Sequence, residues 1–420
     1  MSVERVTFDD IVHTGPGTLA GRYLRSVWQP VYHSADLAPG RAKPLRVMGE
    51  AFTIYRGASG APHLVDRTCP HRGMQLSAGF VEEDAIRCFY HGWKFASDGR
   101  CLEQPAEESR FAGKIRITSY PVREYLGLVF AYLGAGEPPE FQRFPEFEHF
   151  DGLLEIDSYL RECNFFQNLE NSLDQSHIGF VHGTGAASFG NVLGRALKAE
   201  ESEWGLTYTY TREDGQAFVV EFGMPNVVNL ATLPTDPEIG FQEALHWWVP
   251  IDDLTHIQFS VRRAPVTGEA ARSVQERREA RRSEIDLPHQ RVAEEILCGR
   301  LHIVDVDPKR CDIVRLQDDV AQVGQRRIAA RSLEHRGASD VGVVAGRRIW
   351  QRELGAFAEG RRGKAWKRPA GMRPSVWGMN TEPVPAPAAP EVAKVKPVII
   401  DMRPFVEVDV QIRAFGAQLP

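Results

Sequence analysis

The sequence predicts an α+β protein with more than one domain, and three observations support this fold class. Residues from about 20 to 135 form short segments rich in Ile, Val, Phe and Tyr that turn-forming residues separate, a pattern typical of β-strands. Residues 134–145 carry Pro and Gly and mark a domain boundary. The part that follows mixes strand-like and helix-like segments. A chain of 420 residues offers material for two or three domains.

The first part is predicted to contain strands joined by tight turns. A strand-like run over 45–56 ends at the sequence Gly-Ala-Ser-Gly of residues 57–60, which is a hairpin signal. Further β-type segments are expected at 86–95 and 115–133, where β-branched and aromatic residues are frequent.

The second part is predicted to contain both helices and strands. A helix over 164–178 is expected to stop near Gly179. The run of Arg, Glu and Ala over 269–284 is interpreted as a solvated helix or loop, and the Pro-rich residues 381–397 as an extended strap. The other expected strands lie at 206–210, 217–222, 245–250 and 256–260, and the other expected helices at 312–330 and 341–360.

Composition and charge argue against several classes of protein. Fifty basic and 56 acidic residues give a formal net charge of −6, whereas nucleic-acid-binding proteins usually carry a basic surplus. The longest uncharged stretch, 175–194, holds two histidines and five glycines and does not read as a membrane span. The first five residues do not resemble a signal peptide, and the six cysteines are too sparse for a disulfide framework. We therefore expect a cytoplasmic protein that binds neither nucleic acid nor membrane.

Two short loops each combine a cysteine with a histidine. The first contains Cys69 and His71, and the second contains Cys88 and His91. A mixed-ligand [2Fe–2S] cluster needs this set, because two cysteines bind one iron and two histidines bind the other. A Cys2His2 zinc site is chemically possible, but zinc sites usually pair Cys with Cys and His with His. A purely structural turn is less favoured, because four ligand-type residues fall in two matched loops.

These loops resemble the Rieske family, whose pattern Cys-x-His-x-Gly followed by Cys-x-x-His-Gly-Trp is present in full. Respiratory members carry an additional cysteine in each loop, where this sequence has Met74 and Tyr90. The sequence is therefore similar to the lower-potential Rieske centres of oxygenases and their ferredoxins. The resemblance implies that Cys69, His71, Cys88 and His91 hold a [2Fe–2S] cluster.

A polar stripe is predicted on the expected helix at 164–178. Asn171, Asp174 and His177 recur at i, i+3 and i+6, and His182 follows five residues later. On its own, this pattern fits a solvated helix face with structural histidines equally well.

Together with the two loops, the stripe resembles the Asp-x-x-His-x-x-x-x-His motif of ring-hydroxylating oxygenases. The resemblance implies that His177 and His182 bind a mononuclear non-haem Fe(II) and that Asp174 carries electrons toward it. Asn171 on the same stripe is a second candidate catalytic residue. Two imidazoles and one carboxylate leave open positions on such an iron for dioxygen and substrate.

The third iron ligand is implied to be an aspartate on a late helix. Asp318 is the first candidate, and Asp319 is the alternative because helical phase places it nearer the apolar face. Members of the family often have Glu five residues after the ligand, where this sequence has Val323.

Residues 347–354 and 363–366 resemble the C-terminal region of the phthalate dioxygenase and dehydrodivanillate O-demethylase type. The resemblance implies a Rieske β-domain and a helix-grip domain, in which helices cover an antiparallel sheet. It also implies a head-to-tail homotrimer, in which the cluster of one subunit feeds the iron of its neighbour. We expect four segments: an N-terminal part of the catalytic domain at 1–40, the Rieske domain at 41–140, the catalytic domain at 141–375 and a Pro-rich strap at 376–420.

The resemblance implies the oxygenase component of a multicomponent enzyme. Residues 183–188 form only a partial glycine pattern and are interpreted as a loop, and no other glycine-rich nucleotide-binding pattern appears. The sequence therefore predicts no flavin or nicotinamide domain. Electrons are expected from a separate NAD(P)H-dependent reductase, with or without a ferredoxin. With O2, the enzyme would hydroxylate or O-demethylate an aromatic acid or methoxyarene. Three alternatives remain open: a cis-dihydroxylating dioxygenase, a Rieske electron carrier and a zinc-stabilised binding module. A carrier needs no second iron, so the candidate iron ligands distinguish it from an oxygenase.

Overall fold

The computed structural model describes residues 6–108, 111–182, 196–211, 217–232, 239, 242–361, 363–371 and 395–403. These residues divide into two compact units. The first unit spans 14–141, and the second joins the residues before 14 to those after 141. Residues 14–40, expected in the catalytic domain, lie in the first unit, because the strand Gln29–His33 pairs with the strand Leu128–Ala131.

The described residues of the first unit form mainly short antiparallel strands, together with the α-helix α2 (Leu19–Arg25) and three short 3-10 turns. The run predicted as a single strand at 45–56 is divided between two strands, because Met48 and Gly49 both have positive φ and form a tight turn. One sheet contains β1 (Gln29–His33), β11 (Leu128–Ala131) and β10 (Val122–Tyr125). A second contains β2 (Arg41–Val47), β3 (Glu50–Arg56), β4 (Pro62–Asp66) and β9 (Ser119–Tyr120). The third contains β5 (Phe80–Glu82), β6 (Ala85–Arg87), β7 (Lys94–Phe95) and β8 (Cys101–Glu103).

The core of the first unit surrounds the two Cys–His loops. One loop follows β4 and the other joins β6 to β7, so both leave strands that pack on the same apolar cluster. Cys69, Cys88 and Trp93 from the loops are part of this cluster, together with Tyr55, Val65, Leu76, Ile86, Phe95, Cys101 and Ile117. The packing of these three loop residues in the core holds both loops in position.

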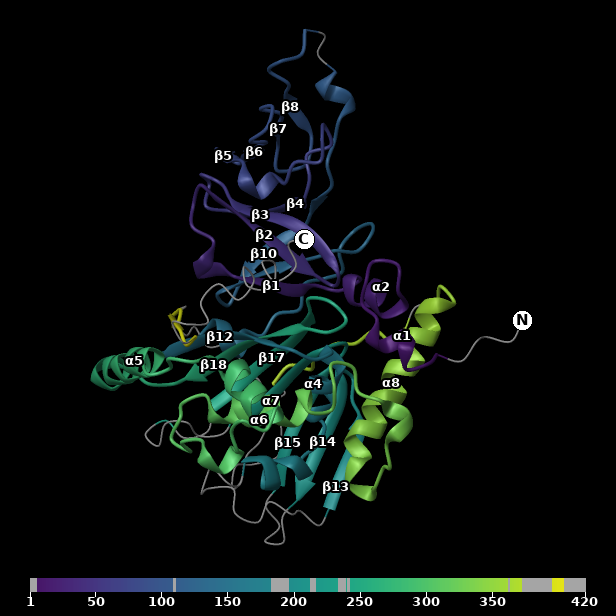
Figure 1. Ribbon diagram of the computed structural model, residues 1–420, viewed down its shortest axis with the longest axis vertical. Coiled ribbons are helices and arrows are strands. Elements are labelled where there is room, and N and C mark those ends of the chain that lie inside the picture. Colours follow the sequence, from purple (N-terminus) through teal and green to yellow (C-terminus); the bar gives the residue numbers. More distant parts are fainter. Residues whose placement is uncertain are drawn as a thin grey trace. The chain divides into compact units, whose positions relative to one another are not determined.

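The second unit is built on an eight-stranded sheet (Figure 1). Neighbouring strands are antiparallel, except that β19 runs parallel to β12. The strand predictions at 206–210, 217–222, 245–250 and 256–260 are confirmed. In spatial order the strands are β13 (Ala196–Glu201), β14 (Gly205–Thr211), β15 (Ala217–Gly223), β16 (Val227–Thr232), β17 (Gln242–Pro250), β18 (His256–Ala264), β12 (Leu153–Arg161) and β19 (Val398–Asp401).

Helices pack on this sheet, and the predicted combination of an antiparallel sheet with covering helices is confirmed. Helix α4 (Phe165–Asn171) packs on β17 and contacts α7 (Ile313–Val323). Helix α6 (His289–Leu297) packs on α7, and α8 (Val341–Ala358) lies along β13 and β14 (Figure 1). The run at 269–284 forms a helix, α5. The α-helices among the described residues of this unit are α1 (Asp9–Val12), α3 (Pro145–Glu148), α4 (Phe165–Asn171), α5 (Gly268–Ser283), α6 (His289–Leu297), α7 (Ile313–Val323) and α8 (Val341–Ala358).

Two predicted helices end earlier than their sequence pattern suggests. Helix α7 ends at Val323, because Gly324 follows it and Arg326 has a φ of 86°. Helix α4 ends at Asn171 instead of continuing to 178, and a separate π-helical turn, η4 (Ile178–His182), follows. The predicted single polar stripe is therefore wrong, since its residues lie on three different local structures.

Polar side chains of several central strands share one face of the sheet. In the antiparallel register, Gln258 of β18 lies opposite Tyr159 of β12 on one side and Trp248 of β17 on the other. Because side chains alternate between faces along a strand, residues at even spacing from these also point to this face. These include His246 and Arg262, and α4 and α7 lie over this face, because Asn168 of α4 bonds Gln258 and Asp318 of α7 lines the same cavity as these residues.

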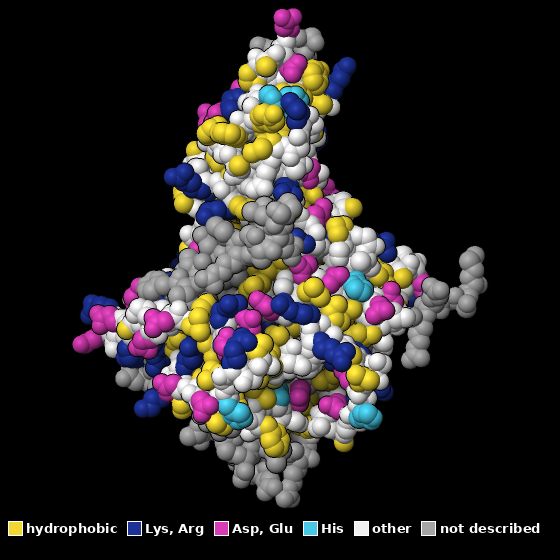
Figure 2. Space-filling model, in the orientation of Figure 1, with side chains coloured by type: hydrophobic (Ala, Val, Ile, Leu, Met, Phe, Trp, Pro, Cys, Tyr) yellow, Lys and Arg dark blue, Asp and Glu magenta, His cyan; other side chains and the backbone are white. Residues whose placement is uncertain are grey.

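On the face shown in Figure 2, Lys and Arg side chains are interspersed with Asp and Glu, consistent with the small net charge. Among the described residues, no helix is long and apolar enough to cross a bilayer. Of the strap predicted at 376–420, residues 395–403 are described and contribute β19, whereas the others lie outside the described residues. The predicted loop at 183–188 also lies outside them.

Candidate functional site

The two Cys–His loops have the same backbone geometry. In each, the cysteine N–H donates to the carbonyl oxygen five residues later, at 2.8 Å for Met74 and 2.8 Å for Trp93. The glycine four residues after each cysteine donates back to the cysteine carbonyl, at 2.9 Å for Gly73 and 3.1 Å for Gly92. Both glycines have a left-handed φ, 73° and 74°, which other residues adopt at a cost. The loops are therefore matched hairpins.

The four predicted cluster ligands lie together at these hairpins. Cys69 and Cys88 are 1% and 2% exposed, and the ring centroids of His71 and His91 are 4.4 Å apart. The His71 Nδ1 atom is buried and has no hydrogen-bond partner among the described residues. Because buried polar atoms are normally satisfied, a buried nitrogen without a partner indicates a site for a bound group such as a metal. The donor set of two thiols and two imidazoles thus fits a mixed-ligand [2Fe–2S] cluster.

The surroundings of this group keep the ligands in place. The His71 ring stacks on the Trp93 indole, with centroids 4.6 Å apart and an interplanar angle of 4°. Burial, with a further contribution from the neighbouring Cys88, raises the pKa of the Cys69 thiol to about 12. The thiol therefore keeps its proton at neutral pH unless a metal displaces it.

A second group of ligand-type residues lies in the second unit. The ligand atoms of His177, His182 and Asp318 are all within 4.8 Å of one another. His182 Nε2 is 3.6 Å from Asp318 Oδ1, and the two histidine ring centroids are 5.4 Å apart. Two imidazoles and a carboxylate at this spacing match the ligand set of non-haem Fe(II) sites.

Three separate segments bring these residues together. His177 follows the turn after α4, His182 ends η4, and Asp318 lies on α7. The five-residue π-helical turn ends at His182 and leaves four residues between the two histidines, and such turns are frequent at functional sites. The sequence therefore predicted the two histidines but not the π-helical turn that brings them together with Asp318.

Protein groups orient both histidines. His177 Nδ1 donates to the backbone carbonyl of Asp174 at 2.5 Å, and His182 Nδ1 donates to Gln317 Oε1 at 3.0 Å. Each ring therefore presents Nε2 to the shared centre. Burial lowers the pKa of His177 below its usual value, although the Asp318 and Asp174 charges oppose this. Its imidazole is then neutral, the form that binds metals. Gln317 was not predicted from the sequence, and its only signal there is its place beside Asp318.

The structure distinguishes the two candidate aspartates. Asp319 points away from the histidine pair: Oδ1 accepts from Arg161 Nε at 2.7 Å, and Oδ2 lies 2.5 Å from His289 Nδ1. Although burial raises its pKa, the His289 and Arg161 charges lower it more, so Asp319 stays ionised. Asp318 is the carboxylate that lies with His177 and His182.

The other two predicted residues both contact this group. Asn171 Nδ2 donates to Asp318 Oδ1 at 3.1 Å and lies 3.3 Å from His177 Nε2. Asp174 holds His177 through its backbone carbonyl, whereas its carboxylate Oδ1 accepts from Ser176 N at 2.8 Å. The Asp174 side chain is 30% exposed, with its second oxygen 3.8 Å from His177 Nδ1.

The three candidate metal ligands border a cavity of about 480 Å³ inside the second unit. One wall is apolar and contains Phe218, Val220 and Leu230 from neighbouring strands. Much of the remaining lining is polar, and a buried carboxylate in it accepts from two guanidinium groups: Asp157 Oδ2 is bonded by Arg262 at 3.1 Å and also by Arg315. The cavity is thus large enough for a small ring compound, with an apolar side and a basic side.

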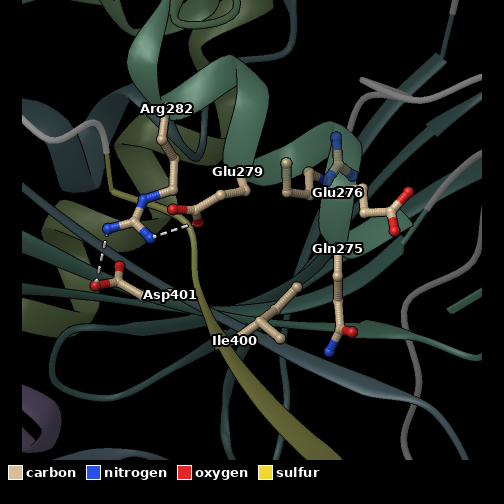
Figure 3. Close-up of a pocket in the computed structure, with 7 residues that line it drawn as sticks. Gln275, Glu276, Glu279, Arg282, Ile400 and Asp401 are labelled. Carbon is tan, nitrogen blue, oxygen red and sulfur yellow. Dashed lines mark hydrogen bonds and ion pairs between the residues drawn. The ribbon is translucent and has the colours of Figure 1, made fainter. Parts of the chain in front are cut away.

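A smaller hollow between α5 and β19 has a different character (Figure 3). Arg282 in its lining pairs with two acidic groups, since it lies 3.0 Å from Glu279 and 3.4 Å from Asp401. Ile400 contributes an apolar floor. This hollow is lined by none of the predicted ligands, so the chemistry of the molecule is assigned to the cavity beside His177.

Two histidines buried in this region predict how stability depends on pH. Burial lowers the pKa of both His246 and His256 to about 3, whereas in the unfolded chain each titrates near its ordinary value of about 6.5. Below that value the unfolded state binds more protons. We therefore expect the free energy of unfolding to fall as the pH falls from 6.5 to 5, by up to about 1.4 kcal/mol per pH unit for each histidine.

This expectation is checked by urea unfolding, followed by tryptophan fluorescence, at several pH values between 5 and 7. The matched control is His246→Gln, which removes one of the two titrating groups. The wild type should lose stability more steeply than the variant over this range. Equal slopes for the two proteins would mean that His246 is not buried in its neutral form.

Comparisons with known proteins agree with this geometry. Residues 27–123 match the Rieske family, described as a Rieske [2Fe-2S] domain. The chain is 32% identical over 372 residues to the 5,5'-dehydrodivanillate O-demethylase oxygenase subunit of Sphingobium sp. (strain NBRC 103272 / SYK-6), with 85% of this chain and 82% of the relative covered. It is 30% identical over 379 residues to the phenoxybenzoate dioxygenase subunit alpha of Ectopseudomonas oleovorans, with 82% and 84% covered.

The fold is also similar to a solved structure, the terminal oxygenase of carbazole 1,9a-dioxygenase from Nocardioides aromaticivorans IC177. The TM-score is 0.56 at 21% identity, over 82% of this chain and 98% of that one. A Rieske [2Fe-2S] domain and a relative of this identity over most of both lengths establish the family. The chain is an oxygenase subunit of the Rieske non-haem iron oxygenase family, of the phthalate dioxygenase and dehydrodivanillate O-demethylase type.

Proposed function

We propose that this subunit hydroxylates or O-demethylates an aromatic acid or methoxyarene, with O2 as the oxidant. In the proposal, Cys69, His71, Cys88 and His91 hold the [2Fe–2S] cluster, and His177, His182 and Asp318 hold one Fe(II). The observation that carries it is the convergence of the last three residues, within 4.8 Å, at the border of a 480 Å³ cavity.

When bound, the cluster would supply single electrons and the iron would activate dioxygen. The protein's own residues bind and orient the substrate. Phe218, Val220 and Leu230 offer an apolar wall against which an aromatic ring can pack and exclude water. Arg262 and Arg315 share one buried carboxylate, so this group of three side chains retains a formal positive charge that favours an anionic substrate.

Electrons would arrive from outside the chain. We propose a separate NAD(P)H-dependent reductase, with or without a ferredoxin, as the donor to the cluster. We also propose a homotrimer in which Asp174 connects the cluster of one subunit to His177 of the next. The support for this role is that the Asp174 backbone carbonyl accepts from His177 while its carboxylate remains 30% exposed.

The reaction is tested by offering methoxylated benzoates and biaryls to the holoenzyme with a generic reductase and isotopically labelled O2. Insertion of oxygen into a methyl C–H bond gives a hemiacetal, which breaks down to a phenol and formaldehyde. For demethylation we expect about one formaldehyde per O2 and per NAD(P)H consumed. Two labelled oxygen atoms in one ring product, with no formaldehyde from any methoxyarene, would replace demethylation by cis-dihydroxylation.

A further inference from the structure

One side of helix α8 follows α4 and the turn after it. Gly342, Gly346 and Trp350 recur every four residues and therefore share a side of α8. The Trp350 ring meets Phe166 of α4 edge-on, with ring centroids 5.4 Å apart. The two glycines lie against Leu173, the second residue after the end of α4. Helix α8 therefore contacts both α4 and the turn that follows it.

The glycines allow a close approach of this turn to α8. A Cβ atom on Gly342 would lie 2.3 Å from the Leu173 carbonyl oxygen and 2.6 Å from the Tyr208 ring. A Cβ atom on Gly346 would lie 2.5 Å from Leu173 Cδ1. At these distances the neighbouring atoms have to shift. Because the atom that faces Gly342 belongs to the backbone, the shift would move the peptide that precedes Asp174.

Four charged side chains hold the end of α4 at a second point. Glu170 Oε1 accepts from Arg347 Nε at 2.5 Å, and Glu170 Oε2 pairs with Arg331 Nη2. Both arginines also donate to Glu334, Arg331 at 2.5 Å and Arg347 at 2.6 Å. The two glutamates and two arginines form a closed group without net charge, which we call the Glu170 ring. Since Arg347 belongs to α8, the ring connects α4 to the same helix that carries the two glycines.

The Glu170 ring is enclosed by the protein. The side chain of Glu170 is 7% exposed, and those of the two arginines are 13% exposed. The Phe8 ring covers both guanidinium groups, with its centroid 4.9 Å from Arg331 Cζ and 5.6 Å from Arg347 Cζ. Burial raises the pKa of Glu170, although the charges of both arginines oppose this. Removing one member of such a buried group costs more than breaking an exposed ion pair, because the remaining charges lose their compensation.

Backbone hydrogen bonds connect this end of α4 to His177. Leu173 N donates to the Glu170 carbonyl oxygen at 2.9 Å. Asp174 N donates to the Asn171 carbonyl oxygen at 3.2 Å. The Asp174 carbonyl oxygen in turn accepts from His177 Nδ1 at 2.5 Å. A displacement at Leu173 would therefore reach the group that orients the imidazole.

We propose that α8 positions His177 through the Glu170 ring and Gly342, and thereby sets the metal affinity of a site to which it contributes no ligand. Glu170, Arg347 and Gly342 are positioning residues in this inference. It rests on the proposed function, because it concerns the same mononuclear site. Contacts that hold a metal ligand in place typically contribute about 10- to 100-fold to metal affinity or activity, so the effect is large enough to measure.

The test measures the affinity of the mononuclear site for Fe(II). Protein with an intact cluster is freed of mononuclear iron by a chelator, and Fe(II) is returned anaerobically in competition with a chromogenic chelator. Gly342→Ala should bind Fe(II) about 10- to 100-fold more weakly than the wild type. Because alanine favours a helix more than glycine does, this loss would not come from α8 itself.

The matched control is Gly355→Ala, the same substitution in the same helix. A Cβ atom at this position would meet a Val6 methyl carbon at 3.7 Å, which is an ordinary contact. This variant should therefore keep the Fe(II) affinity of the wild type.

A second pair of variants tests the Glu170 ring. Glu170→Gln removes one charge of the ring and should weaken Fe(II) binding about tenfold. Its control is Glu201→Gln, because Glu201 also pairs with an arginine of α8, Arg352, at 2.6 Å. Both members of that pair are exposed, so no change in Fe(II) affinity is expected.

Sulfide content and urea unfolding of each variant report the loading of the cluster and the stability. Unchanged Fe(II) affinity in Gly342→Ala and Glu170→Gln, or an equal loss in the two controls, would overturn the inference. Lower stability with unchanged affinity would do the same, since the contacts would then support the fold alone. If Gly342→Ala does not fold, the comparison of Glu170→Gln with Glu201→Gln decides. A wild type that binds Fe(II) no better than His177→Ala would instead contradict the mononuclear site, and with it the proposed function.

Discussion

His177→Ala is expected to remove one iron from a total of about three per chain and to leave the acid-labile iron and sulfide of the cluster intact. The variant loses a ligand whose Nε2 faces His182 and Asp318, and the two remaining ligands are too few for a stable site. Turnover should fall by about a thousandfold or more, because the metal supplies several kcal/mol of transition-state stabilisation. The measurement is iron and sulfide analysis of anaerobically purified protein, with O2 uptake as the activity.

Two further variants show which metal site each lost iron belongs to. Cys69→Ala should lose the acid-labile iron and keep the mononuclear one, the reverse pattern. His302→Ala, at an exposed histidine, should have the iron content of the wild type. A fully active wild-type enzyme with only two irons would contradict the mononuclear assignment. Stoichiometric zinc without sulfide would contradict the cluster.

Asp174→Asn is expected to load both metal sites and yet to turn over on the order of 10- to 100-fold more slowly, the usual effect of changing an outer-sphere partner of a metal ligand. The substitution removes the charge but keeps Oδ1, which can still accept from Ser176 N. The backbone carbonyl that holds His177 is unchanged. The loss should therefore be in electron delivery to the iron, and stopped-flow should show normal reduction of the cluster by the reductase.

The matched control is Asp305→Asn, which removes an exposed carboxylate outside the cavity and should leave turnover unchanged. Near-native turnover of Asp174→Asn with full metal content would show that the carboxylate is not the connection between cluster and iron. Loss of iron from the variant would instead assign Asp174 a structural part in the mononuclear site.

The sequence predicted those parts of the molecule whose functional residues are close together in the chain. The ligands of each Cys–His loop lie within five residues, so the motif alone brings thiol and imidazole to one hairpin. The strands of the large sheet were predicted because apolar and polar residues alternate along their sequences. The two histidines of the second site were also indicated, through their resemblance to a known motif.

Features that depend on tertiary contacts were not predicted. The helix expected to 178 ends at Asn171, since the chain must turn to bring His177 and His182 to α7, and helix propensity is too weak to resist this. His246 has no motif around it, and strand pairing places Gln258 and Ser260 within hydrogen-bond distance of its Nδ1. The register of a hairpin depends on the geometry of its turn, which the sequence pattern did not specify, so this buried histidine had no sequence signal.

The hydrogen bonds that direct His177 and His182 toward Asp318 have a consequence for metal selection. Two neutral imidazoles and a carboxylate, held by a backbone carbonyl and an amide, form a ligand set that many first-row divalent ions accept. On such ligands zinc and copper bind more tightly than ferrous iron, following the Irving–Williams order. Nothing in this trio of ligands favours iron by affinity. In the proposed enzyme, loading with iron would therefore depend on site geometry and on the metal supply during synthesis, and zinc and copper are the ions that would compete for the site.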